Sequence, residues 1–105
     1  MAWVILVMAG LFEVVWASAM KQSSGFTRLW PSVVTLTFMM LSFLFLSIAM
    51  KSLPLGTAYV TWVGLGAIGT YITSIVLLGE NFNIFQGIAV SLIMAGVILL
   101  TFTAP

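Results

Sequence analysis

Long apolar runs alternate with short polar segments along the whole chain. Four runs, at about residues 2–20, 31–50, 56–78 and 84–104, are dominated by Leu, Ile, Val, Ala, Phe and Met. A transmembrane α-helix needs roughly 20 apolar residues, and each run supplies that length. The pattern predicts an all-α membrane protein in which residues 1–105 form a single domain of four transmembrane helices. Only the first run contains a charged residue, Glu13.

Composition narrows the possible functions. Hydrophobic residues make up 63% of the 105 residues and charged residues 5%, whereas a soluble domain has about 25% charged residues. A soluble enzyme is therefore excluded, and lipid is the expected surrounding. The chain has no Cys or His, so we expect no disulfide, no metal site and no cofactor. A net charge of +1 gives no basic surface for nucleic acid.

The charges in the connectors specify orientation only weakly. Basic loops prefer the cytoplasm. The first connector carries Lys21 and Arg28, the second carries Lys51, and the third carries Glu80 but no base. One possibility is a weakly oriented protein that relies on a partner. The other is insertion in both orientations, which would give an antiparallel homodimer. Four helices are also too few to enclose a substrate path, which favours a dimer.

Glu13 is the main candidate for function. A carboxylate in the middle of a membrane helix costs roughly 2.5–3.5 kcal/mol on insertion scales, and the predicted helices contain no basic residue to pair with it. A neutral Glu that only bridges helices is one interpretation. The other is a site that holds either a proton or an organic cation. Because the two compete for one carboxylate, such a site would couple proton entry to cation export, as in an antiporter.

Polar and aromatic residues recur at helical spacing near this carboxylate. Gly10 and Trp16 lie one turn from Glu13 on the first helix. The Trp16 indole offers an N–H group to the carboxylate and a π face to a cation. Ser42 is the most central hydroxyl of the second helix. Tyr59 and Trp62 share a face of the third helix and predict a shared cavity, with mere packing as the alternative.

Small residues mark the third and fourth helices. Gly64, Gly66 and Gly69 match G-x-G-x-x-G, but a dinucleotide site needs a preceding strand. Inside a membrane helix we interpret them as a hinge or a close-packing face. Ala89 and Gly96, seven residues apart, predict a dimerisation face on the fourth helix, with packing inside the monomer as the alternative.

With these residues in view, the whole chain resembles the small multidrug resistance family. The matches are the membrane Glu13 and the segments at residues 25–32, 53–59, 62–66, 79–80 and 95–96. The resemblance implies an antiparallel, dual-topology homodimer in a bacterial inner membrane that exchanges protons for organic cations by alternating access. It implies that Glu13 is the shared binding residue, that Tyr59 and Trp62 line the cavity, and that Ser42 is a polar neighbour of Glu13.

Two positions resemble the guanidinium exporter subtype in particular. These are Trp16, three residues after Glu13, and Met39, where drug exporters often carry an aromatic residue. A planar guanidinium binds a carboxylate at two points, which favours an ordered polar site. Departures from the subtype at four positions would fit a variant that also transports substituted guanidines or small quaternary ammonium ions: Phe38, Thr61, Val63 and Thr101.

The leading hypothesis is a proton-coupled exporter of guanidinium and related small cations. A multidrug exporter of quaternary ammonium and other lipophilic cations keeps the mechanism but changes the substrate. A non-transporting membrane subunit would use Glu13 only for assembly, and a passive channel would not respond to a proton gradient. Pairing with a second, different chain is a further alternative to the homodimer.

Overall fold

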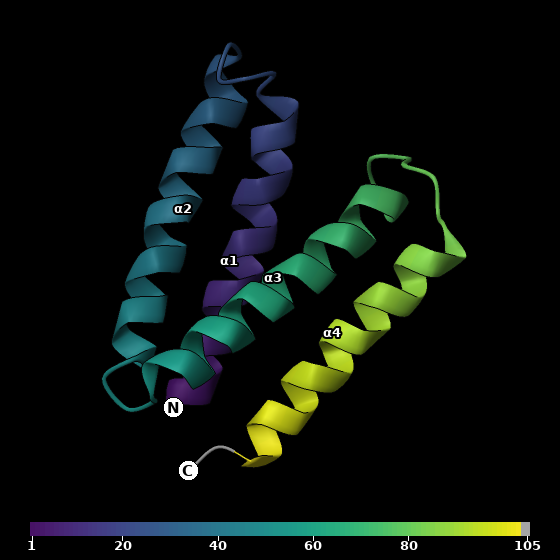
Figure 1. The fold of residues 1–105 in the computed structure, drawn as a ribbon. Helices are drawn as coiled ribbons and strands as arrows, with labels where there is room; N and C mark the ends of the chain where they lie inside the picture. The colour runs from purple at the N-terminus through teal and green to yellow at the C-terminus, as the bar shows by residue number, and fades with distance from the viewer. Residues whose placement is uncertain (104–105) are drawn as a thin grey trace.

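A computed structural model describes residues 1–103 and shows four α-helices (Figure 1). Helix α1 spans Ala2–Gln22, α2 spans Leu29–Ala49, α3 spans Leu55–Val76 and α4 spans Ile84–Thr103. Each helix is long and apolar enough to cross a membrane, because about 20 residues at 1.5 Å per residue match the hydrocarbon thickness. The prediction of an all-α protein with four potential spans is confirmed.

The starts of α1 and α4 coincide with the predicted ranges, and the other described helix ends differ from them by one or two residues. Helix α1 continues to Gln22, and α2 begins at Leu29 rather than at Pro31. Pro31 fits inside the first turn, where backbone N–H groups have no partner within the helix. Helix α3 ends at Val76, before Gly79 turns the chain with a φ of 72°. The predicted end of the fourth helix at residue 104 lies outside the described residues.

The connector between α1 and α2 is a tight turn. Ser24, Gly25 and Phe26 adopt φ values of 51°, 74° and 67° in succession, a left-handed conformation that costs non-glycine residues energy. The Ser23 hydroxyl holds the turn: it donates to the Met20 carbonyl at 2.7 Å and accepts the Phe26 N–H at 3.0 Å. The left-handed conformation thus includes both neighbours of Gly25 as well as the glycine itself.

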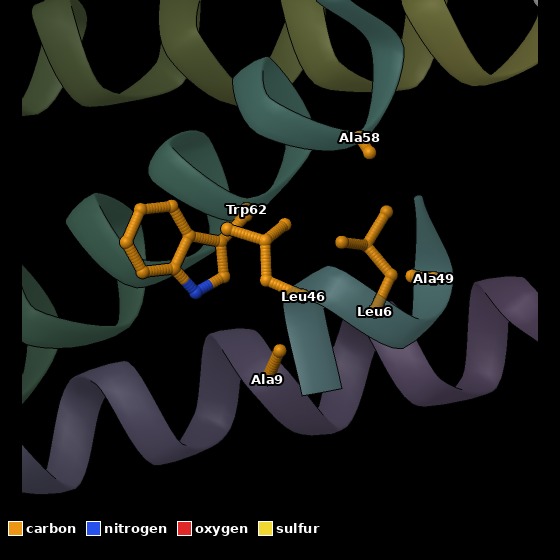
Figure 2. Close-up of a cluster of buried hydrophobic side chains, with 6 residues drawn as sticks. All are labelled: Leu6, Ala9, Leu46, Ala49, Ala58 and Trp62. Atoms are coloured by element: carbon orange, nitrogen blue, oxygen red, sulfur yellow. The ribbon is translucent and has the colours of Figure 1, made fainter. Parts of the chain in front are cut away.

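A small apolar core joins the first three helices (Figure 2). Three of its six members are alanines, which allow the helix backbones to approach closely. In Figure 2 the side chains from the three helices point toward one another. The core residues are Leu6 and Ala9 from α1, Leu46 and Ala49 from α2, and Ala58 and Trp62 from α3. This core positions the central part of α1, where Glu13 lies.

Helix α4 stands apart from this core. Within residues 1–103 it packs against α3 alone, beside which it runs in Figure 1. Val97 is its one buried residue, and the apolar side chains on its other faces are exposed. The described chain therefore leaves most of α4 to lipid or to another protein.

The helices alternate in direction, so the first and third connectors lie at one end of the molecule (Figure 1). Lys21, Arg28 and Glu80 belong to that end, and Lys51 belongs to the opposite end. In charged side chains, the first end therefore carries two bases and one acid, and the opposite end carries one base. The net charge of the two ends is equal.

Candidate functional site

Glu13 lies near the midpoint of α1, and its carboxyl group packs against the backbone of α3 at Gly66. A methyl group added to Gly66 would overlap the carboxyl group. The same close approach recurs one turn to each side. A Cβ on Gly10 would lie 3.0 Å from the Cβ of Leu65, and a methyl group on Gly69 would overlap Val14. Glycine is thus needed where the Glu13 side chain lies between the two helices.

The three predicted hinge glycines serve as contact points on two sides of α3. Gly66 and Gly69 face α1, whereas a methyl group on Gly64 would overlap Val97 of α4. Helix α3 is continuous from Leu55 to Val76 through all of them. The close-packing interpretation describes what these glycines do here, and the hinge stays a prediction.

The carboxyl group of Glu13 lacks a partner in the described chain. Its Oε1 atom is buried and accepts no hydrogen bond within residues 1–103. The basic residues Lys21, Arg28 and Lys51 all lie at helix ends or in connectors. A buried acceptor without a partner is costly, and an unpaired charge costs more. The arrangement therefore favours a proton or a bound cation on Glu13.

Ser42 connects three helices one turn away from Glu13. The Ser42 side chain is fully buried; its hydroxyl donates to the Ala9 carbonyl at 2.8 Å and accepts the Trp62 Nε1–H at 2.9 Å. In a regular helix the Ala9 carbonyl also accepts the backbone N–H of Glu13. Ser42 thus holds the backbone turn that precedes Glu13, and its hydroxyl is engaged there rather than on the carboxylate.

Four aromatic side chains form a row beside the site, each in contact with the next. Ring centroids are 6.3 Å apart for Trp16 and Phe43, 5.8 Å for Phe43 and Trp62, and 5.6 Å for Trp62 and Tyr59. Tyr59 is 50% exposed and Trp62 7% exposed. The row presents π surfaces of the kind that attract cations. The Trp16 Nε1 atom is buried without a partner within residues 1–103, so it does not donate to Glu13 here.

Phe43 is the member of this row that the sequence interpretation missed. It follows Ser42 directly and lies four residues after Met39, so all three fall on one side of α2. Met39 is partly buried, whereas Phe43 is exposed. The four-residue spacing from Met39 is the sequence signal that places Phe43 on the same side of α2.

The two small residues predicted for dimer packing have little contact with their own chain. Ala89 is exposed, and a Cβ added to Gly96 would meet nothing within 4 Å. Gly96 lines an apolar groove between α3 and α4 with a volume of about 460 Å³. The described chain thus offers Ala89 and Gly96 no tight partner, and their role in a dimer stays a prediction.

Three of the four residues that depart from the guanidinium exporter subtype either contact a neighbouring residue or are buried. The Phe38 ring packs edge-on against Phe12, and the Thr101 hydroxyl donates to the Val97 carbonyl. Thr61 is 2% exposed, and its hydroxyl lacks a partner within residues 1–103. Val63 is exposed on α3 and lines the groove toward α4.

The fold and the site together define the class of protein to which the chain belongs. The chain is a multi-pass membrane protein with one carboxyl group in the middle of a membrane-spanning helix, bordered by aromatic rings. Among the described residues, no three His, Cys, Asp or Glu side chains gather as metal ligands would. Residues 1–93 match the family model described as Small Multidrug Resistance protein. The chain belongs to this family, as its sequence motifs predicted.

Similar proteins with the name "Guanidinium exporter" cover nearly the whole chain. The relative from Yersinia pseudotuberculosis is 55% identical over 98 residues, which are 93% of this chain and 94% of the relative. The relative from Escherichia coli K12 is also 55% identical over 98 residues, 93% of each chain. The Salmonella typhimurium relative is 51% identical over 104 residues, 99% of each chain. The predicted resemblance to the guanidinium exporter subtype is confirmed, and these relatives are named as exporters rather than enzymes.

Proposed function

We propose that this chain exports guanidinium and related small guanidinyl cations in exchange for protons. The observation that carries the proposal is Glu13: a carboxyl group near the midpoint of a membrane-spanning helix, whose buried Oε1 has no partner within residues 1–103. The similarity to three proteins named guanidinium exporters supports the choice of cation. Protons that move down their gradient through the same carboxylate would supply the driving force.

Coupling follows from competition for one site. A proton on Glu13 removes the charge that attracts a cation, and a bound cation neutralises the charge that attracts a proton. A low-dielectric surrounding strengthens both interactions, because water screens them less. If the site opens to one side of the membrane at a time, protons entering from outside displace the cation outward. This is alternating access with a single shared carboxylate.

The neighbouring groups suit guanidinium better than a bulky drug cation. Guanidinium is planar and can donate two parallel N–H bonds to one carboxylate. The Ser42 bridge from Trp62 to the Ala9 carbonyl holds the backbone turn before Glu13, which restrains the helix segment that carries the carboxylate. The adjacent aromatic row adds cation–π attraction. Trp16 fills the next turn of α1, where a smaller residue would leave room for a larger cation.

We further propose that two copies assemble as an antiparallel homodimer in a bacterial inner membrane. The exposed faces of α4 and the small bias in basic residues, two at one end and one at the other, support assembly in opposite orientations. The named relatives are all from bacteria. In such a dimer two Glu13 side chains would share one cavity, with the inverted symmetry that larger transporters build within one chain. In the alternative assembly, a second, different chain would take the place of one of the two copies.

Transport current on a solid-supported membrane tests the proposal. Proteoliposomes of the purified chain receive guanidinium, then tetramethylammonium, in the presence and absence of a proton gradient. We expect a guanidinium current that the gradient increases. Glu13→Gln should abolish it, because Gln keeps a hydrogen-bonding side chain but cannot hold a proton or a charge. Glu13→Asp is the matched control, since it keeps the carboxylate and should retain measurable current.

The other outcomes decide between the alternatives. A current with tetramethylammonium alone would assign the chain to drug export. A guanidinium current that ignores the proton gradient and survives Glu13→Gln would indicate a channel. Silence with both cations in a preparation that has the mass of a dimer would favour the assembly subunit. Silence from a monomer would point to a missing partner chain.

A further inference from the structure

Phe12 directly precedes Glu13 on α1, and its ring lies between two rings of α2. The ring centroid of Phe12 is 5.6 Å from that of Phe38 and 5.2 Å from that of Phe45, with interplanar angles of 61° and 67°. Edge-on contact at such distances is a preferred arrangement of aromatic rings. Phe38 is also one of the four residues at which the chain departs from the guanidinium exporter subtype. The three rings form a second aromatic cluster, distinct from the row beside the site.

A hydrogen bond restrains α1 one turn before Phe12. The Ser42 hydroxyl donates to the Ala9 carbonyl at 2.8 Å, and Ser42 lies four residues after Phe38 and three before Phe45. The three residues of α2 therefore share one face of that helix. Ala9 lies three residues before Phe12, so these two positions share a face of α1 as well. Helix α1 is thus attached to one face of α2 at two successive turns, once by a hydrogen bond and once by a ring.

Lipid alone would leave the rotation of α1 about its own axis undefined. The exposed face of this helix, which includes Val7 and Leu11, is apolar, and so is the face that carries Leu6 and Ala9 in the core. Lipid tails are as apolar as these side chains, so the hydrophobic effect does not select the face that meets protein. Specific contacts such as that of Phe12 must therefore set the rotation.

The rotation of α1 decides where the Glu13 carboxyl group lies. This group packs against α3 at Gly66, whereas the preceding residue, Phe12, contacts α2. At the surface of a helix, about 5–6 Å from its axis, a rotation of about 10° moves a side-chain group by roughly 1 Å. A binding group has to be held to within about 0.5 Å of its productive position. A small rotation of α1 would therefore be enough to weaken the site.

We propose that Phe12, held between Phe38 and Phe45, is a positioning residue that fixes the rotation of α1 and so directs the Glu13 carboxyl group toward α3. The effect on guanidinium transport rests on the proposed function, whereas the effect on the contact between α1 and α3 does not. Phe12 acts through the helix that carries Glu13 and does not contact the cation.

A disulfide between α1 and α3 reports the rotation without transport. A Cβ on Gly10 would lie 3.0 Å from the Cβ of Leu65, close to the roughly 3.5–4.5 Å that a disulfide requires, and the native chain contains no Cys. Gly10→Cys and Leu65→Cys are combined with Phe12→Ala or, as the matched control, with Leu11→Ala. Leu11 is the neighbouring residue of α1 and is 60% exposed. Gel electrophoresis after oxidation separates a disulfide within one chain from a cross-linked dimer.

We expect the disulfide within the chain to form at least fivefold more slowly with Phe12→Ala than with Leu11→Ala. Phe12→Leu, which keeps an apolar side chain but removes the ring, repeats the measurement if Phe12→Ala does not fold. An equal or higher rate with the Phe12 variant would show that the ring does not fix the rotation and would overturn the proposal.

Guanidinium currents of Phe12→Ala and Leu11→Ala, without the two added Cys, separate positioning from stability. A displaced carboxylate binds guanidinium more weakly, so we expect Phe12→Ala to raise the half-maximal guanidinium concentration at least fivefold and to change the maximal current less than twofold. Leu11→Ala should match the wild type. A lower maximal current with an unchanged half-maximal concentration would indicate a contact that only stabilises the fold, and would overturn the positioning role. If the wild-type chain carries no guanidinium current while Phe12→Ala slows the disulfide, the proposed function fails and the positioning of α1 stands.

Discussion

At the scale of single residues, the site depends on a glycine as much as on a carboxylate. Glu13 can lie between α1 and α3 only because Gly66 has no side chain. Close helix contacts in membranes use small residues in this way, since dispersion and hydrogen bonding replace the hydrophobic effect. The Oε1 atom of Glu13 has no hydrogen-bond partner in the part of the chain that the structure describes, which is consistent with a position for an exchangeable proton or cation.

Gly66→Ala tests that contact. We expect the new methyl group to displace the Glu13 side chain and reduce the guanidinium current at least tenfold. Gly56→Ala is the matched control, because a Cβ at Gly56 meets nothing within 4 Å. It should keep the current and gain up to about 1 kcal/mol from the higher helix propensity of Ala. Solid-supported membrane recordings give the current and thermal melts give the stability. Full current in Gly66→Ala would show that the Glu13 contact with Gly66 is dispensable.

Ser42→Ala tests the hydrogen bonds that hold the turn before Glu13. The change leaves the Trp62 indole without its acceptor, and losing one hydrogen bond costs about 1 kcal/mol. We expect guanidinium to bind about fivefold more weakly, as measured by tryptophan fluorescence titration. Ser47→Ala, at an exposed position of the same helix, should leave the affinity unchanged. Equal affinities in the two variants would make Ser42 a packing residue.

Trp16→Gly tests selectivity. Removing the indole opens space one turn beyond Glu13 and takes away an aromatic ring that contacts Phe43. We expect the ratio of guanidinium to tetramethylammonium current to fall, because the larger cation gains room while the flat one loses a π surface. The ratio of the two peak currents in the same proteoliposomes is the measurement. An unchanged ratio would remove Trp16 from the determinants of selectivity.

At the scale of helices, α3 is the central element. One face packs on α1 through Gly66 and Gly69, and another packs on α4 through Gly64. A change in the tilt of α3 would therefore alter the contacts of Glu13 and of α4 together. If the site changes sides as we propose, α3 is therefore the helix that we expect to move.

Gly64→Ala with Val97→Ala tests the contact between α3 and α4. A methyl group on Gly64 would overlap Val97, and overpacking typically costs about 1–3 kcal/mol. We therefore expect Gly64→Ala to lower the melting temperature despite its better helix propensity. Val97→Ala in the same chain should restore part of the loss, because it removes the overlapping group. A double-mutant cycle with no coupling between the two sites would contradict this contact.

At the scale of the whole molecule, two features of the chain concern its assembly: the exposure of α4 and the distribution of charge between the two ends. Within residues 1–103, α4 packs against α3 alone and has one buried residue, Val97. One end carries two basic residues and the other carries one, so the sequence gives little preference for either orientation. Both features fit a protein completed by a second copy in the opposite orientation.

Single cysteines in the connectors test the orientation, since the native chain contributes none. Ser24→Cys reports the first connector and Ser52→Cys the second, and both positions are exposed. With a membrane-impermeant maleimide on intact cells, we expect about half of the chains to be labelled at each position. One position fully labelled and the other unlabelled would indicate a fixed orientation and would exclude the dual-topology homodimer.

Much of the fold could be predicted from sequence because lipid imposes a simple rule. Backbone groups in the membrane must be satisfied within the helix, so about 20 apolar residues suffice to define a span. The apolar runs and their connectors therefore located all four helices to within about two residues at each described end. Glu13 was found by the same logic, as the one charge inside those runs.

The local partners required the tertiary structure. Helical spacing predicts which residues share a face of one helix, but it does not determine the register between two helices. The contact of Glu13 with Gly66, the Ser42 bridge from Trp62 to Ala9 and the place of Phe43 in the aromatic row all depend on that register. The sequence by itself determined the helices, their lipid surroundings and the carboxylate. A membrane penalises polar and charged groups inside a span, so the spans and the one charge within them can be recognised from the sequence. The tertiary structure alone decided which small residues meet the carboxylate and where a groove remains, because these depend on how side chains from different helices interlock.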